Sequence, residues 1–122
     1  MFDERLLLLA AEYRNRGIPK YGELLLDPND ALELLMELTQ LEVLVIGCGC
    51  WKYVEWEEQT AYELPGGGCS PELEIPFLEM TPTANAAIIT KFIREREFLN
   101  YQFDLIAFRF NELEVGYLFS GE

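Results

Sequence analysis

Residues 41–56, LEVLVIGCGCWKYVEW, decide the fold because they hold two strand-like runs around a glycine-cysteine repeat. The apolar run from Leu41 to Ile46 is rich in β-branched residues, which predicts a buried strand. The run from Trp51 to Trp56 alternates along the chain as the two faces of a second strand do. We interpret Gly47-Cys48-Gly49-Cys50 as a turn or a bulge between these strands.

Helical patterns lie on both sides of this centre. Apolar residues at helical spacing predict three helices, over residues 3–16, 28–39 and 84–98. Asp27-Pro28 supplies an N-cap carboxylate and a proline at the first helical position of the second helix. Gly17 is placed to end the first helix, and Thr81-Pro82-Thr83 opens the third.

Further strands are predicted from short runs of alternating or β-branched residues. Pro76 lacks an N–H group, so a strand containing it lies at a sheet edge or is bulged. Composition makes Pro65-Gly66-Gly67-Gly68 a loop. The strands predicted in this way cover residues 23–26, 60–64, 72–80, 102–110 and 114–119.

The order of these elements predicts an α+β fold. We expect a single domain over residues 1–122, with a mostly antiparallel sheet of four to six strands and about three helices packed on one face. Half of the 122 residues are hydrophobic and 13% are aromatic, which is enough apolar surface for one core.

Negative charge is concentrated in the middle of the chain. The segment from Tyr21 to Thr90 holds thirteen carboxylates and one cation, Lys52, and so carries 12 of the 13 net negative charges. Such a field attracts basic proteins and repels phosphates and anionic membranes. We therefore expect a basic protein partner, with no direct nucleic-acid binding and no membrane binding. A surface that serves solubility alone would have the same composition.

An acidic-aromatic segment is the first candidate contact surface. Aromatic anchors among carboxylates can grip arginine and lysine side chains by cation–π contacts and ion pairs. The alternative is a half-buried strand with aromatic residues in the core and glutamates in water. The partner-binding residues predicted here are Trp51, Tyr53, Glu55, Trp56, Glu57 and Glu58, followed by Glu33 and Glu37 on the polar face of the second helix.

The three cysteines and the absence of histidine limit the metal-binding and catalytic chemistry that the sequence predicts. Cys48, Cys50 and Cys69 could supply three thiolates to zinc, but no histidine is available as the fourth ligand. Free thiols are the simpler interpretation, and we expect no cofactor. Without histidine, the usual base that works near neutral pH is missing, so we expect a protein that is not an enzyme. The sequence shows no basic leader and only short apolar stretches, which favours a cytoplasmic location.

Residues 17–56 resemble part of one group of bacterial immunity proteins from polymorphic-toxin systems. The resemblance lies in the connector from Gly17 to Leu26, the run Asp30-Ala31-Leu32-Glu33-Leu34-Leu35, and Val43-Leu44-Val45-Ile46-Gly47 followed by Trp51. That group has a Gly-Gly-Asp where this chain has Gly47-Cys48-Gly49. The resemblance implies a stoichiometric inhibitor.

These patterns lead to one functional hypothesis with alternatives. We expect a small acidic immunity-type inhibitor that neutralises a cationic protein such as a toxin or nuclease. A phage-encoded nucleic-acid mimic with an anti-defence role rests on the same electrostatics. A small ligand-binding or enzymatic domain, or a homodimer with its aromatic residues at the subunit interface, remains open.

Overall fold

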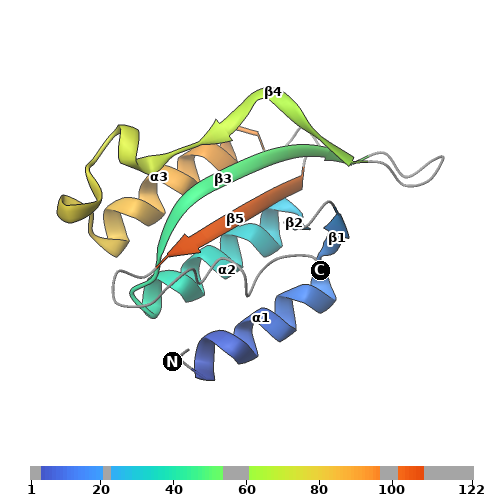
Figure 1. The fold of residues 1–122 in the computed structure, drawn as a ribbon, viewed down its shortest axis with the longest axis horizontal. Coiled ribbons are helices and arrows are strands. Elements are labelled where there is room, and N and C mark those ends of the chain that lie inside the picture. Colours follow the sequence, from blue (N-terminus) through green and yellow to red (C-terminus); the bar gives the residue numbers. More distant parts are fainter. Residues whose placement is uncertain (1–3, 21–22, 54–60, 97–101, 109–122) are drawn as a thin grey trace.

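The structure is a computed structural model that describes residues 4–20, 23–53, 61–96 and 102–108 (Figure 1). In chain order, its helices and strands are α1 (Glu4–Arg16), β1 (Ile18–Lys20), β2 (Glu23–Leu25), α2 (Pro28–Gln40), β3 (Leu44–Tyr53), β4 (Ala61–Cys69), the 3-10 helices η1 (Pro71–Leu73) and η2 (Phe77–Glu79), α3 (Pro82–Arg94) and β5 (Gln102–Phe108).

The strands form two antiparallel sheets. Strands β4, β3 and β5 make a three-stranded sheet in that order, and β1 pairs with β2 in a separate two-stranded sheet. Just after β2, Leu26 exchanges both backbone hydrogen bonds with Phe103 of β5, at 2.8 Å each. The predicted sheet of four to six strands is therefore wrong, because the described strands divide into sheets of three and two.

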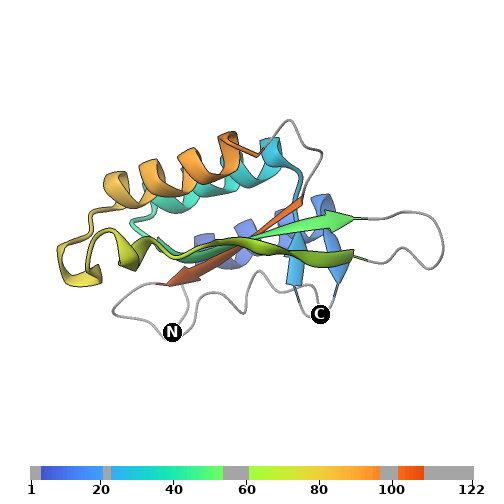
Figure 2. The ribbon, with the colours of Figure 1, turned by 90° about the horizontal axis from the view of Figure 1, so that it is seen from above.

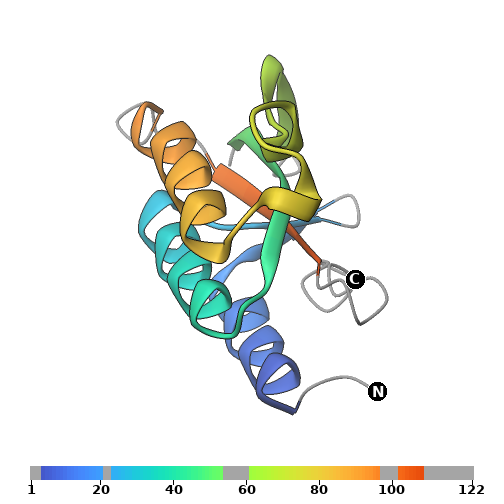
Figure 3. The ribbon, with the colours of Figure 1, turned by 90° about the vertical axis from the view of Figure 1, so that its left-hand side faces the viewer.

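Helices α2 and α3 lie side by side over one face of the three-stranded sheet, and α1 lies next to α2 at the edge of this layer (Figures 2 and 3). The predicted arrangement of about three helices packed on that face is thus corrected to two, with α1 packed against α2 and β1. One hydrophobic cluster joins α1, α2, α3, β3 and β5. Its fully buried side chains include Leu6, Tyr13, Leu34, Leu38, Val45, Ile89, Ile93 and Phe103.

The ends of α2 follow from local sequence. The Asp27 side chain accepts a hydrogen bond from the Asp30 N–H group, as expected of an N-cap before Pro28. At the other end, the N–H groups of Glu42 and Val43 donate to the carbonyls of Thr39 and Leu38, which is the Schellman motif. Residues 41–43 therefore turn the chain out of α2, and the strand predicted from Leu41 begins only at Leu44.

Strand β3 runs unbroken through the glycine-cysteine repeat, so the predicted division into two strands is wrong. Its pairing with β5 has a bulge between Val45 and Gly47. The bulge changes which residues face the helices: Val45 is buried before it, and Cys48 and Cys50 are buried after it. The extra residue of the bulge shifts the alternation of the strand by one position. Cys48 and Cys50 therefore face the core after the bulge.

Strand β4 differs from the prediction in length. It continues to Cys69 and includes the expected loop at residues 65–68. Gly68 pairs with Gly49 and Glu63 pairs with Trp51, so four residues of β4 lie opposite one residue of β3. Pro65, Gly66 and Gly67 belong to this bulged part of a strand at the sheet edge, where a missing N–H group is tolerated.

Residues 72–80 are not the predicted edge strand but two 3-10 turns, η1 and η2. Pro71 and Pro76 hold backbone angles that suit the start of a turn, and their carbonyls accept the N–H groups of Glu74 and Glu79 at 2.9 Å each. The predicted strand over residues 114–119 lies outside the described residues. The third helix begins at Pro82 and ends at Arg94, with Glu95 as its C-cap, so the predicted helix over residues 84–98 starts two residues too late and ends four residues too late.

Candidate protein-binding surface

The first predicted contact surface is described only in part. The backbones of Trp51 and Tyr53 lie at the end of β3, paired with Glu63 and Ala61 of β4. The predicted residues Glu55, Trp56, Glu57 and Glu58 lie outside the described residues. Partner binding by this segment therefore stays a prediction.

The second predicted surface, on α2, has partners within the protein. The Arg16 guanidinium of α1 donates hydrogen bonds to Asp30 and Glu33, and the Tyr13 hydroxyl donates to Glu37 Oε2 at 3.0 Å. The guanidinium also lies over the Tyr13 ring, 4.5 Å from its centre. The like charges of Glu33 and Glu37 on one helix face are thus offset by residues from another helix.

The electrostatics of this contact follow from burial and pairing. Burial raises the pKa of the Tyr13 hydroxyl above its ordinary value, and the hydrogen bond to the Glu37 carboxylate raises it further. The pKa of Arg16 is also raised, first by its hydrogen bond to Glu33 and then by that to Asp30. Both groups keep their protons at neutral pH, which holds α1 against α2.

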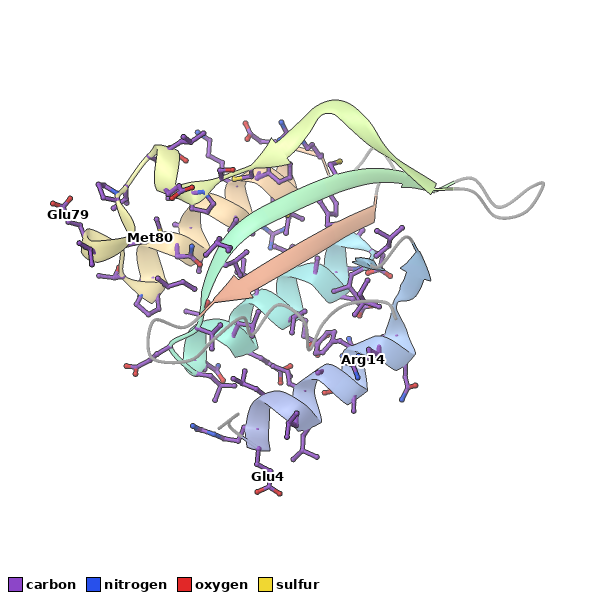
Figure 4. The ribbon with its side chains drawn as sticks, in the orientation of Figure 1. Glu4, Arg14, Glu79 and Met80 are labelled. Carbon is purple, nitrogen blue, oxygen red and sulfur yellow. The ribbon has the colours of Figure 1, made fainter. Side chains whose placement is uncertain are left out.

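A third acidic surface is formed by residues 70–80, which we name the 70–80 loop. It is buried near both ends, at Pro71 and at Met80. Between them, the leucines of the two 3-10 turns project into solvent: Leu73 is 85% exposed and Leu78 is 93% exposed. Figure 4 shows Glu79 pointing away from the body of the protein at the tip of this loop.

The carboxylates of the 70–80 loop differ from those of α2. Glu72, Glu74 and Glu79 are all exposed. None of them makes an ion pair with a residue that the structure describes. The loop therefore combines exposed apolar side chains with negative charge that has no cation bound to it inside the described part of the protein.

Asn85 of α3 fixes the position of this loop. Its side chain is buried at 1% exposure, accepts from the Val45 N–H group at 2.9 Å and donates to the Val45 carbonyl at 2.8 Å. It also donates to Met80 Sδ at 3.2 Å. Val45 precedes the part of β3 that pairs with β4, so Asn85 satisfies its peptide groups as a neighbouring strand would. The same side chain ties the end of the 70–80 loop to the sheet.

Sequence reasoning missed the 70–80 loop because the alternation of Leu73, Ile75 and Phe77 with polar residues matches a strand. A signal against a strand was present in its prolines. Pro71, Pro76 and Pro82 recur at spacings of five and six residues, and each removes an N–H group that a sheet would use.

The cysteines lie on neighbouring strands. Cys48 and Cys50 of β3 are buried, Cys69 of β4 is half-buried, and all three are thiols. No group of three or more metal-binding side chains among the described residues is arranged to hold a metal ion. The described residues therefore contain no site of the kind that the zinc alternative requires.

A shallow open groove of about 240 Å³ lies between α2 and α3. Aliphatic and polar side chains line it, among them Leu32, Met36, Thr39 and Thr90. It differs from the deep, aromatic-lined cavity that a small ligand-binding domain would be expected to have.

Within the described residues, no helix is both long enough and apolar enough to cross a membrane. No protein-family model, curated protein or solved structure matches the chain.

Proposed function

We propose that this protein is a small acidic inhibitor of the immunity type, which binds and neutralises a cationic protein such as a toxin or nuclease. The observation that carries the proposal is the 70–80 loop, where two almost fully exposed leucines stand among three carboxylates that have no ion-pair partner in the described structure.

Leu73 and Leu78 are the two most exposed large apolar side chains among the described residues. Large apolar side chains in water gain free energy when a partner covers them. Leu73 and Leu78 lie on turns held by backbone hydrogen bonds and by the buried ends of the loop. A loop that is already ordered loses less conformational entropy on binding, which favours affinity.

The charge of the loop indicates the chemistry of the partner. Carboxylates around an apolar contact steer a basic protein toward it and reject acidic competitors. The partner surface that fits has apolar pockets for Leu73 and Leu78, with lysine or arginine at its rim. A nuclease or other nucleic-acid-binding protein carries such basic surfaces, and covering them would block its substrate.

The two acidic surfaces predicted from the sequence have secondary roles in this proposal. Glu33 and Glu37 hold α1 on α2, so only their remaining exposed oxygens are available to a partner. The segment with Trp51, Tyr53 and Glu55 to Glu58 is a second contact region. If replacing Glu55, Glu57 and Glu58 by glutamine leaves the association rate at low salt unchanged, that segment takes no part.

The experiment that tests the function uses the whole chain as bait at low salt in a lysate of the native host. Captured proteins are eluted with salt, identified, and produced separately. We expect a basic protein whose toxic or nuclease activity falls to nothing at one molar equivalent of this chain. A captured protein that keeps full activity, or recovery of acidic proteins only, would contradict an inhibitor of this class.

Two alternatives give different outcomes in the same experiment. A nucleic-acid mimic would capture a host defence complex in place of a toxin, and the gene neighbourhood would hold phage genes. A homodimer that buries Leu73 and Leu78 would run at twice its mass on sizing, and replacing both leucines by serine would restore the monomer.

A further inference from the structure

Two of the three cysteines face each other across the sheet. Cys48 of β3 and Cys69 of β4 are opposite residues in the antiparallel register. Opposite residues of an antiparallel pair project to the same face of the sheet. Cys48 is buried in the core, at 3% exposure, and Cys69 packs against that core from its half-buried position. Cys50 lies where the β3–β4 register is irregular, between Gly49 and Trp51.

The backbone bonds of the neighbouring strands show which kind of pair this is. Phe103 directs both its N–H and C=O groups to Leu26, away from β3, so the opposite residue Cys50 directs its own groups toward β4. Cys48, two residues earlier in regular register with β5, does the same. Cys48 and Cys69 therefore form a hydrogen-bonded pair.

This geometry permits a disulfide under strain. The Cα atoms of a hydrogen-bonded antiparallel pair lie about 5.5 Å apart, which is close to the commonest Cα separation in disulfides. The Cβ atoms of such pairs lie about 5.5 Å apart, whereas a relaxed disulfide brings them to about 3.8 Å. The strands must move slightly together, and the resulting strain makes the bond easier to reduce.

We propose that Cys48 and Cys69 are a reversible redox pair, which a low-molecular-weight disulfide such as glutathione disulfide converts into a cross-strand disulfide. In the first step the Cys69 thiolate attacks one sulfur of glutathione disulfide, forms a mixed disulfide and releases one glutathione thiolate. In the second, the Cys48 thiolate attacks the Cys69 sulfur, closes the bond and releases the second glutathione. The two cysteines lose two protons and two electrons, and glutathione disulfide becomes two thiols.

The exposure of the two sulfurs sets this order. Cys69 is the more accessible of the two, so the oxidant meets it first, and the buried Cys48 acts as the resolving thiol. Burial and the Glu74 carboxylate raise the pKa of the Cys69 thiol, while Arg96 lowers it. The first step is therefore slow at neutral pH and becomes faster as the pH rises.

A Cys48–Cys69 disulfide would enclose the acidic-aromatic segment that the sequence predicts to bind a partner. Residues 49–68 lie between the two cysteines, and they include Trp51, Tyr53 and Glu55 to Glu58. A disulfide between Cys48 and Cys69 restrains β4 against β3 at the end of their pairing where these two residues lie. This inference is independent of the proposed function.

The test treats the native protein with glutathione disulfide, quenches with acid, blocks remaining thiols and maps the peptides by mass spectrometry. We expect the intact mass to fall by two hydrogens, a Cys48–Cys69 link in the map, Cys50 recovered as a thiol, and full reversal by dithiothreitol. The Cys50→Ser variant should behave as the wild type does. Cys48→Ser should stop at the glutathione adduct of Cys69.

Three results would overturn the proposal: a wild-type protein that keeps the glutathione adduct, one that links Cys50 to Cys69, or one that does not react in the native state. Because the wild-type peptide map decides among these, the test holds even where Cys48→Ser folds poorly. The same treatment in denaturant is the control, since mixed pairings are expected there. The melting temperature of the oxidised native protein should exceed that of the reduced protein.

Discussion

At the scale of single residues, Asn85 stands out because it is the one buried polar residue among those that the structure describes. It occupies a position on the same helical stripe as Ile89 and Phe92, where an apolar residue is expected. A buried amide at such a place must have hydrogen-bond partners, and the structure supplies them from Val45 and Met80. The stripe could predict that position 85 is buried, but only the fold gives its partners.

We predict that Asn85→Ala lowers the free energy of unfolding by at least about 2 kcal/mol, because it leaves the buried N–H and C=O groups of Val45 unpaired. Urea denaturation measures the change. Asn29→Ala, at an exposed position of α2, is the control and should stay within about 0.5 kcal/mol of the wild type. An Asn85→Ala protein as stable as that control would show that water replaces the amide at no cost.

Glu42 is a second residue whose role depends on backbone geometry. Its φ is 60°, the left-handed conformation that glycine adopts most readily, and it stands at the position of the Schellman motif where glycine is usual. We predict that Glu42→Gly raises the free energy of unfolding by about 1 kcal/mol, measured by urea denaturation. Glu42→Ala removes the same charge but keeps the strain, so a gain as large in Glu42→Ala would contradict the backbone explanation.

At the scale of elements, sequence predicted the helices well and the central strands poorly, for physical reasons. Asp27-Pro28 specifies a helix start through contacts within one turn, and all of that information is local. The length of β3 depends on a bulge whose partner is more than fifty residues away in β5. The contact of Arg16 with Asp30 and Glu33 joins two helices, so no pattern within either helix could reveal it.

The contact of α1 with α2 should depend on pH through Tyr13. The folded protein holds the Tyr13 proton above the ordinary pKa of 10.0, whereas the unfolded chain releases it there. The stability that Tyr13 contributes is thus complete below pH 10 and is lost as the pH rises beyond it, by up to about 1.4 kcal/mol per pH unit. We predict that wild type exceeds Tyr13→Phe by about 1 kcal/mol at neutral pH, and that the difference shrinks above pH 10.

Denaturation of both proteins from pH 7 to pH 11 measures this difference, and other titrating groups cancel because the two chains share them. A difference that stays constant, or that grows with pH, would show that the Tyr13 hydroxyl is not held by Glu37 in the folded state.

Substitutions of the leucines in the 70–80 loop should leave stability almost unchanged but weaken partner binding. Leu73→Ser with Leu78→Ser should change the free energy of unfolding by less than about 0.5 kcal/mol, since both side chains are already in water. The same pair should weaken partner binding at least about tenfold, measured by calorimetry. Leu7→Ser with Leu8→Ser, on the exposed face of α1, is the matched control. If all these variants bind the partner as tightly as the wild type does, the loop is not part of the interface.

At the scale of the whole molecule, composition predicted a negative field but could not predict how it is distributed. Part of the central charge is compensated by Arg16, at the junction of α1 and α2. Another part, at Glu72, Glu74 and Glu79, stands in solvent around two leucines. We therefore expect partner binding to depend on where the carboxylates lie, because total charge alone sets only a weak, nonspecific attraction.

The rate of association with the captured partner, measured by stopped flow at low and at high salt, tests this claim most directly. Glu72→Gln, Glu74→Gln and Glu79→Gln together remove three charges from the 70–80 loop. Glu4→Gln, Glu42→Gln and Glu95→Gln remove three exposed charges elsewhere; Figure 4 shows Glu4 at the bottom of the view, on α1 and away from Glu79. We predict a low-salt rate about tenfold lower for the loop variant, with a weaker dependence on salt, and a control close to wild type. Equal rates for the two variants would contradict the account.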